Sequence, residues 1–302
     1  MTALQAPITR THRHGWWWKA LLVGLGLWAA SIVVTVVTLN SNLIPTLILI
    51  GSFLVPLCVV LFAAERITGT MTGTTIVLVF FLSGVFGVLG ASLLEDSLVP
   101  SVLTYFLVGF IEEFVKAAIL VIVGWRLVPK TAGQGALLGA TVGAGFAAFE
   151  SAGYAFNAAL TSQGINLVSL LQTEVLRAVL APVGHVLWTA IFGAVWFGAA
   201  RGRSRLRFAF AAIGAYVAVA ILHGLWDSMS GFSTFLAVLL TGNLVRVEQF
   251  GFLPPGSAAA VSALAITVYV VGLVVIAALG LLTLRLCLRH YRVREARSPQ
   301  VA

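Results

Sequence analysis

The chain consists of long apolar runs separated by short polar stretches. A helix of about 20 apolar residues crosses the roughly 30 Å hydrocarbon core of a bilayer. The runs therefore predict about eight transmembrane helices, near residues 18–39, 43–64, 75–94, 99–125, 134–160, 168–198, 207–230 and 260–286. Residues 232–240 are apolar but short for a span, and we predict an outer loop or re-entrant segment there. The pattern predicts an all-α, polytopic membrane helical bundle.

Composition supports the same class and leaves no room for a separate soluble domain. The 302 residues are 60% hydrophobic and 9% charged, whereas soluble domains are about 25% charged. We predict a cytoplasmic N-terminal tail at residues 1–17, a transmembrane bundle at 18–286 with a motif-bearing core at 99–230, and a basic cytoplasmic tail at 287–302. The first apolar run has no A-x-A-like cleavage site, which favours a retained first span over a signal peptide.

The basic residues predict the orientation of the bundle. Lys and Arg collect in the cytoplasmic loops of membrane proteins. Here they precede the first predicted span, follow the second, fourth and sixth, and end the chain, so the main clusters all fall on one side. Both termini are therefore predicted to be cytoplasmic, in a multi-pass protein of the cell membrane. Basic loops beside anionic lipid also account for the net charge of +8 without a nucleic-acid partner.

Three charged residues interrupt the fourth predicted span. Residues 109–120 read GFIEEFVKAAIL, which places Glu112, Glu113 and Lys116 near the middle of the membrane. A charge at that depth costs from about 3 to more than 10 kcal/mol. Lys116 follows the glutamates by four and three residues, so its ammonium group can reach both on one helix face. Because ionisable groups inside a membrane mark functional sites by default, we predict that this face belongs to one.

Three further spans bring polar residues to a similar depth. In the fifth span, small residues repeat every four positions and predict a close helix contact, with Glu150 on the same inward face. The sixth span carries His185 beyond Pro182, which is predicted to kink the helix. The seventh span places His223 and Asp227 at positions i and i+4, on one face. We predict that these residues meet the Glu-Glu-Lys face in one interior region.

Other polar or reactive residues in the spans are given no role in this region. Arg177 and Glu174 lie three residues apart and are predicted to form a local ion pair. The two cysteines, Cys58 and Cys287, lie in different apolar segments without a CxxC motif or neighbouring histidines. Neither a disulfide framework nor a structural zinc site is therefore predicted.

The order of these motifs resembles that of a known family. EExxK at residues 112–116, FxxxE at 146–150, a histidine in the sixth span and HxxxD at 223–227 are similar to the PrsW family of intramembrane proteases, and distantly to the CAAX-protease and bacteriocin-processing superfamily. The resemblance covers about residues 109–227. It implies a multi-span helical bundle that cuts a peptide bond in or next to the membrane, in a membrane-anchored protein such as an anti-sigma factor.

The resemblance also implies roles for individual residues. Peptide hydrolysis requires a base for water, a group that stabilises the oxyanion, and an acid for the leaving amine. By resemblance, Glu112 and Glu113 are the water-activating pair and Lys116 is their electrostatic partner. The remaining candidates for contacts to water or the oxyanion are His185, His223 and Asp227. In CAAX proteases the second motif ends in histidine, whereas here it ends in Glu150, so its role stays open.

Metal dependence is also left open by the sequence. Catalytic zinc commonly has three protein ligands from histidine and carboxylate, and the candidates are Glu113, Glu150, His185 and His223. Lys116 would repel a divalent ion, and the HExxH spacing that presets two ligands is missing. We predict glutamate-activated water without an obligatory cofactor, and zinc is the alternative.

Two rival functions use the same residues. A proton-coupled transporter or channel would use the buried carboxylates and histidines as a relay, but transporters are often built from repeats, and the chain has no second EExxK or HxxxD. A catalytically silent scaffold would explain the small-residue packing and leave the carboxylates unexplained. No GxSxG motif suggests a serine nucleophile, and Asp227 is the only aspartate within the predicted spans. The substrate identity and the oligomeric state are not predicted.

Overall fold

The computed structural model describes residues 14–67, 69–99, 101–162, 164–200, 205–253 and 255–297. Most of the predicted N-terminal tail, the last five residues of the predicted basic tail and the arginines at 10, 13, 201 and 203 lie outside the described residues. The sidedness of the termini therefore stays a prediction.

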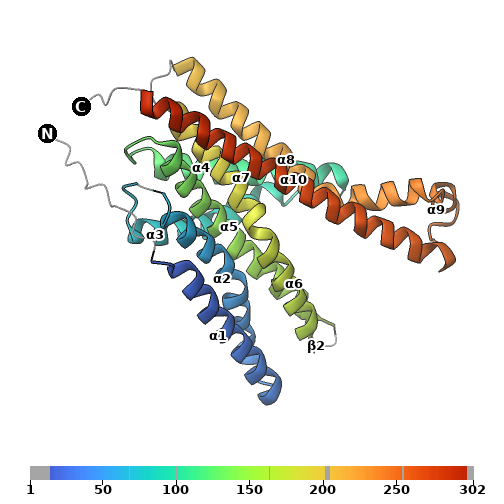
Figure 1. The fold of residues 1–302 in the computed structure, drawn as a ribbon. Helices are drawn as coiled ribbons and strands as arrows, with labels where there is room; N and C mark the ends of the chain where they lie inside the picture. Colours follow the sequence, from blue (N-terminus) through green and yellow to red (C-terminus); the bar gives the residue numbers. More distant parts are fainter. Residues whose placement is uncertain are drawn as a thin grey trace.

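The regular elements of the described chain are helices, apart from two short strands that form an antiparallel pair (Figure 1). This architecture confirms the all-α class. The elements in chain order are α1 (Trp16–Thr38), η1 (Ser41–Leu43), α2 (Ile44–Ala64), α3 (Gly73–Glu95), α4 (Val102–Gly124), α5 (Ala132–Ala159), β1 (Leu160–Thr161), β2 (Gly164–Ile165), α6 (Leu167–Leu180), η2 (Ala181–Val183), α7 (His185–Ala200), α8 (Arg205–Leu240), α9 (Leu244–Phe250) and α10 (Pro255–Arg297).

Seven stretches of the described residues are long and apolar enough to cross a membrane, and the protein is a multi-pass membrane protein. They contain α1, α2, α3, α5, α6 with α7, α8, and α10. The remaining predicted span, at 99–125, corresponds to α4. This helix is long enough to cross, with 23 residues, but it carries the three charges of the Glu-Glu-Lys face.

Two helices extend further than the apolar pattern predicts. The prediction of an outer loop or re-entrant segment at residues 232–240 was wrong, because α8 continues without interruption to Leu240. It ends just before Gly242, whose φ of 69° stops a helix. Likewise α10 extends past the apolar run into the predicted basic tail and ends at Arg297. The reason is that Leu, Arg and Glu continue a helix readily, whether or not they lie in lipid.

The centre of the bundle is the close contact between α5 and α7. A Cβ atom added at Gly135 or Gly139 would lie 2.1 Å from a carbonyl oxygen of α7, and one at Gly143 would lie 2.3 Å from the His185 carbonyl oxygen. Only glycine permits this approach of two backbones. The contact confirms the predicted small-residue ridge, and it fixes the start of α7 beside the middle of α5.

A second group of helices completes the interior. Helix α4 packs on α8, where a Cβ atom at Gly109 would lie 2.5 Å from the backbone nitrogen of Gly224. The Tyr216 hydroxyl also donates a hydrogen bond to the Phe110 carbonyl oxygen at 3.0 Å. Helix α10 runs along α8 and α7, and the α8–α10 pair extends away from the other helices toward α9 (Figure 1). This packing turns the Glu-Glu-Lys face of α4 toward α7 and α8.

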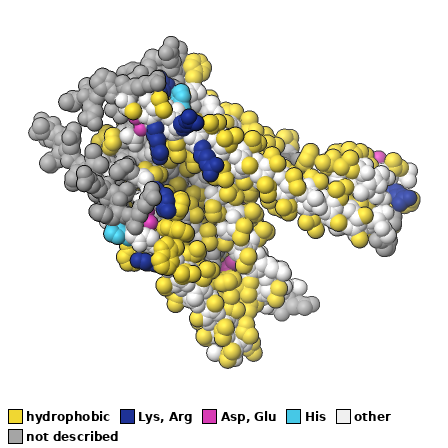
Figure 2. Space-filling model, viewed as in Figure 1, with side chains coloured by type: hydrophobic (Ala, Val, Ile, Leu, Met, Phe, Trp, Pro, Cys, Tyr) yellow, Lys and Arg dark blue, Asp and Glu magenta, His cyan; other side chains and the backbone are white. Residues whose placement is uncertain are grey.

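The visible surface is mainly hydrophobic, as lipid-facing helices require (Figure 2). Most of the Lys and Arg side chains visible in this view gather at the end of the molecule away from α9. That end contains the α2–α3 and α4–α5 loops and the last turns of α10. The distribution matches the one-sided basic clusters in the sequence.

Candidate active site

The Lys116 ammonium group is the centre of a buried group of charges on α4. Its Nζ atom lies 2.8 Å from Glu113 Oε1 and 3.2 Å from Glu112 Oε2. It also lies 2.9 Å from His185 Nδ1 and 4.1 Å from the centre of the Phe146 ring. Lys116 is 0% exposed, and both glutamates are buried. The predicted shared helix face is confirmed, and it is closed off from lipid.

His223 joins this group from α8. Its Nδ1 atom lies 3.1 Å from Glu113 Oε1, and its Nε2 atom lies 3.2 Å from Asp227 Oδ2 and 3.6 Å from Glu112 Oε2. The ring is fully buried and packs on Trp188, with ring centres 4.6 Å apart. The i, i+4 spacing of the HxxxD motif therefore places Asp227 on the same side of α8 as His223, and both face α4.

His185 is the first residue of α7 and links α4 to α5. The disturbance of the helix predicted at Pro182 is confirmed and goes further than a kink, since the turn η2 separates α6 from α7. Because an ammonium group can only donate a hydrogen bond, His185 Nδ1 accepts from Lys116 and the ring proton lies on Nε2. His185 Nε2 lies 2.9 Å from Glu150 Oε2, so this nitrogen donates to the Glu150 carboxylate.

Arg177 belongs to the site, which the sequence did not predict. It donates hydrogen bonds to Glu150 Oε2 and to Ser151 Oγ, the latter at 2.8 Å. The predicted pairing of Arg177 with Glu174 was wrong. Glu174 instead accepts a hydrogen bond from Trp28 Nε1 of α1 at 2.8 Å. The two residues lie on different sides of α6, which faces α5 on one side and α1 and α2 on the other.

A sequence signal for Arg177 was present. Glu150 is an acidic residue within a predicted span, and a buried carboxylate requires a cation or hydrogen-bond donors. Arg177 is a basic residue in the next predicted span and can reach such a carboxylate only if α6 turns it toward α5. We call the resulting set the polar cluster; its members are Glu112, Glu113, Lys116, Glu150, Arg177, His185, His223 and Asp227.

A cavity of about 530 Å³ reaches the polar cluster from one end of the bundle. Glu112, Glu150 and His185 line it near the cluster, together with Arg177 and Asp227. Further lining residues come from the last turns of α3, the start of α4 and the end of α5, namely Ala91, Ser92, Glu95, Tyr105, Asn157 and neighbours. The cavity therefore extends toward the end of the bundle opposite the basic loops. Its volume is within the range of ligand-binding clefts in proteins.

The comparison with known proteins agrees with this geometry. The sequence model described as PrsW family intramembrane metalloprotease matches residues 45–279. The chain belongs to the PrsW family. A search of curated proteins and a search of solved structures gave no match.

Family membership confirms the resemblance seen in the motifs and extends it over most of the spans. The protein is a peptide hydrolase of the membrane, so the interpretation as a transporter or a silent scaffold is set aside. The buried glutamates and histidines are consistent with a catalytic site, and a protease requires a protein substrate.

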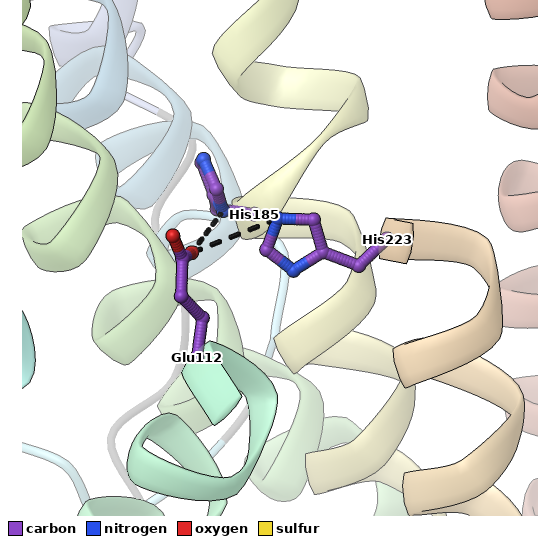
Figure 3. A group of neighbouring side chains, drawn as sticks. All are labelled: Glu112, His185 and His223. Carbon is purple, nitrogen blue, oxygen red and sulfur yellow. Dashed lines mark ion pairs between the residues drawn. The ribbon is translucent and has the colours of Figure 1, made fainter. Parts of the chain in front are cut away.

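One part of the polar cluster fits a metal ion, as the description of the PrsW family implies. Glu112, His185 and His223 each present one ligand atom, and these atoms lie within 4.8 Å of one another (Figure 3). Two imidazoles and a carboxylate are a common ligand set for catalytic zinc. The buried His223 Nε2 atom accepts or donates no hydrogen bond within the described residues, although Asp227 Oδ2 lies 3.2 Å from it. Lys116 opposes a cation here, because its charge lies 2.9 Å from His185 Nδ1.

This ligand set overlaps with the candidates named from the sequence. It shares His185 and His223 with them and contains Glu112 in place of Glu113 and Glu150. Glu113 Oε1 contacts Lys116 and His223 Nδ1, and Glu150 Oε2 contacts Arg177 and His185. Both of these carboxylates therefore serve as partners of other cluster residues.

Proposed function

We propose that the protein is an endopeptidase that hydrolyses a peptide bond in or next to the membrane-spanning part of a membrane-anchored protein. The observation that carries this proposal is the cavity, which leads from one end of the bundle to a buried carboxylate flanked by two histidines. In this proposal α4 is an eighth membrane span. Its three charges are tolerated because they are paired with one another and with α7 and α8 inside the bundle.

Glu112 is the carboxylate that contacts the attacking water. It lines the cavity, and its Oε2 atom lies 3.7 Å from His185 Nδ1 and 3.6 Å from His223 Nε2. A water molecule held there can lose a proton to the carboxylate as its oxygen attacks the scissile carbonyl carbon. The protonated Glu112 carboxyl group can then return this proton to the amine nitrogen when the C–N bond breaks.

The other members of the polar cluster hold these groups in place. Glu113 is not part of the cavity wall; it accepts hydrogen bonds that fix the Lys116 ammonium group and the His223 ring. Glu150 fixes the His185 ring, and Arg177 compensates the charge of Glu150. A carboxylate behind a histidine sets the ring orientation and tautomer in many active sites. This orienting role answers the question that the sequence left open for Glu150.

Glu112, His185 and His223 are the residues that would hold a metal ion. A bound zinc ion lowers the pKa of its water to about 7 and polarises carbonyl groups. Glu113, whose Oε1 atom lies 3.1 Å from His223 Nδ1, would then orient this ligand from behind. In that case Glu112 would be a metal ligand and not the base.

The test is cleavage of tethered single-span peptides by the purified protein in lipid. We expect defined products from the wild-type protein, and at least about 100-fold slower turnover for Glu112→Gln and Glu113→Gln. The matched control is Glu248→Gln, because Glu248 is an exposed glutamate on α9. Wild-type turnover in both cluster variants would refute the assignment, and a peptide gradient without products would restore the transporter.

A further inference from the structure

Glu95 is an acidic residue in the cavity wall that the proposed reaction does not use. It is the last residue of α3 and lines the cavity together with Tyr105 of α4. Its side chain is partly buried, and its Oε1 atom is buried without a hydrogen-bond partner among the described residues. A buried carboxylate oxygen without a partner is unfavourable by about 1–3 kcal/mol or more. Such an atom is expected to gain a donor when the cavity is filled.

Glu95 also differs from the other acidic residues of the cavity in its charge balance. Glu112 is paired with Lys116, Glu150 with Arg177, and Asp227 with His223. No ion pair involves Glu95 in the described part of the chain. Among the described acidic residues of the cavity wall, Glu95 is thus the one without an ion-pair partner.

The position of Glu95 along α3 gives its distance from the polar cluster along the helix axis. A Cβ atom at Gly87 would lie 2.8 Å from the Phe146 ring, which itself covers Lys116, so Gly87 is level with the polar cluster. Glu95 follows eight residues later, about 12 Å further along the helix axis at 1.5 Å per residue. An extended peptide advances about 3.3 Å per residue. Glu95 therefore lies level with a substrate residue about three to four positions from the scissile bond.

We propose that Glu95 determines specificity by binding a Lys or Arg side chain of the substrate, three to four residues from the scissile bond. The inference rests on the proposed peptidase function. A cationic side chain supplies both the missing donor and the missing charge, and it does so in a partly desolvated cavity where charge pairs are stronger than in water. A substrate without that cation leaves Glu95 unpaired, and this difference discriminates between substrates.

The experiment measures kcat/KM for a series of single-span peptides that differ at one position. Glutamine is replaced by lysine, and in a parallel set by glutamate, at each of the first six positions on each side of the scissile bond. For the wild-type protein we expect lysine at the third or fourth position, on one side only, to raise kcat/KM by at least about fivefold, which is about 1 kcal/mol. The gain should appear in KM, since the contact is made before and during the reaction.

The variants separate this contact from bulk electrostatics. In Glu95→Gln the lysine-to-glutamine ratio of kcat/KM should fall to about one, and in Glu95→Lys a glutamate-containing peptide should become the preferred one. The matched control is Asp96→Asn, because Asp96 is the next residue, exposed and outside the cavity wall. It should keep the wild-type ratio. Glu95→Asp retains the charge and should keep a ratio above one, which tests the inference even if another variant fails to fold.

The outcomes distinguish the two proposals. If the wild-type protein cleaves no peptide, the proposed function fails. If it cleaves but shows the same ratio as Glu95→Gln, only the role of Glu95 is refuted. An equal fall of the ratio in Asp96→Asn would also refute it, because the preference would then come from the general negative potential at this end of the bundle.

Discussion

Replacement of Lys116 by methionine tests the polar cluster most directly. Methionine fills a similar volume without the charge, and position 116 is fully buried, so solvent cannot replace the ammonium group. The change removes the ion pairs to Glu113 at 2.8 Å and Glu112 at 3.2 Å, together with the donor to His185 Nδ1 at 2.9 Å. It leaves two adjacent carboxylates facing each other without a cation between them.

The expected loss of stability is large. Removing one partner of a buried ion pair costs about 3–5 kcal/mol, because the remaining charge is left uncompensated. Lys116 serves two carboxylates, but one of these can take up a proton and so limit the cost. We therefore expect a loss of about 3–5 kcal/mol in the free energy of unfolding. The double variant Lys116→Met with Glu113→Gln should recover about 1–3 kcal/mol of it, since the second change removes an unpaired charge.

The assay is equilibrium unfolding in detergent micelles, followed by tryptophan fluorescence. Trp188 packs against His223 and should report the loss of the cluster. The control is Lys19→Met, since Lys19 is exposed and its ammonium group lies 5.1 Å and 5.8 Å from the centres of the Trp16 and Trp18 rings. Its loss should be about 0.5–1 kcal/mol. Equal stability of the Lys116 and Lys19 variants, or no recovery in the double variant, would refute the ion pairing described above.

Three further predictions concern the metal ion, the membrane orientation and the contact between α5 and α7. If Glu112, His185 and His223 hold a metal ion, elemental analysis of the active protein finds about one zinc per chain, and chelation abolishes activity until zinc is restored. Active protein without bound metal supports the reaction in which Glu112 itself activates water. A reporter at Gln249 of α9 should be extracytoplasmic and one at Pro299 cytoplasmic; an external signal at Pro299 would refute the orientation. Gly139→Ala should lower stability by about 1–3 kcal/mol or more, because its Cβ would lie 2.1 Å from the Thr189 carbonyl oxygen. Gly153→Ala on the same helix meets no atom within 4 Å and should cause no loss.

Local parts of the site were predictable because helix geometry alone determines them. Lys116 follows Glu113 by three residues, and Asp227 follows His223 by four, so any helix places each pair together. The same holds for the glycine ridge of α5, whose period of four residues matches one helix face. These predictions required no knowledge of how the helices pack.

Contacts between helices were less predictable, and Arg177 shows the reason. Its partner depends on the rotation of α6 about its own axis, which follows from the break at Pro182 and from the contact of Glu174 with Trp28. The rotation of α6 cannot be read from the sequence spacing of Arg177 and Glu174. The residues of the candidate metal site likewise depend on how the helices pack against one another. The choice of Glu112 over Glu113 depends on which carboxylate α7 and α8 approach from the cavity side.

The spans themselves followed the hydropathy pattern, and the exceptions have a common cause. Hydropathy reports whether a segment is stable in lipid, whereas helix formation depends on backbone hydrogen bonding and on the absence of stops. Helix α8 continues to Leu240 because its first stop is the turn at Gly242. Helix α4 is the opposite case: its 23 residues are enough to cross the membrane, but its three charged residues lower its hydropathy.

The charge balance of the polar cluster connects the metal question with the protonation of the histidines. The cluster contains four carboxylates and two permanent cations, namely Glu112, Glu113, Glu150, Asp227, Lys116 and Arg177. With both histidines neutral it carries two uncompensated negative charges, which is costly in an interior of low dielectric constant. A divalent ion held by neutral histidines would balance them, and so would two additional protons, on the histidines or on the carboxylates. Elemental analysis of the active protein therefore decides more than its metal content: zinc implies two neutral imidazole ligands, whereas its absence implies that the resting cluster stores two protons.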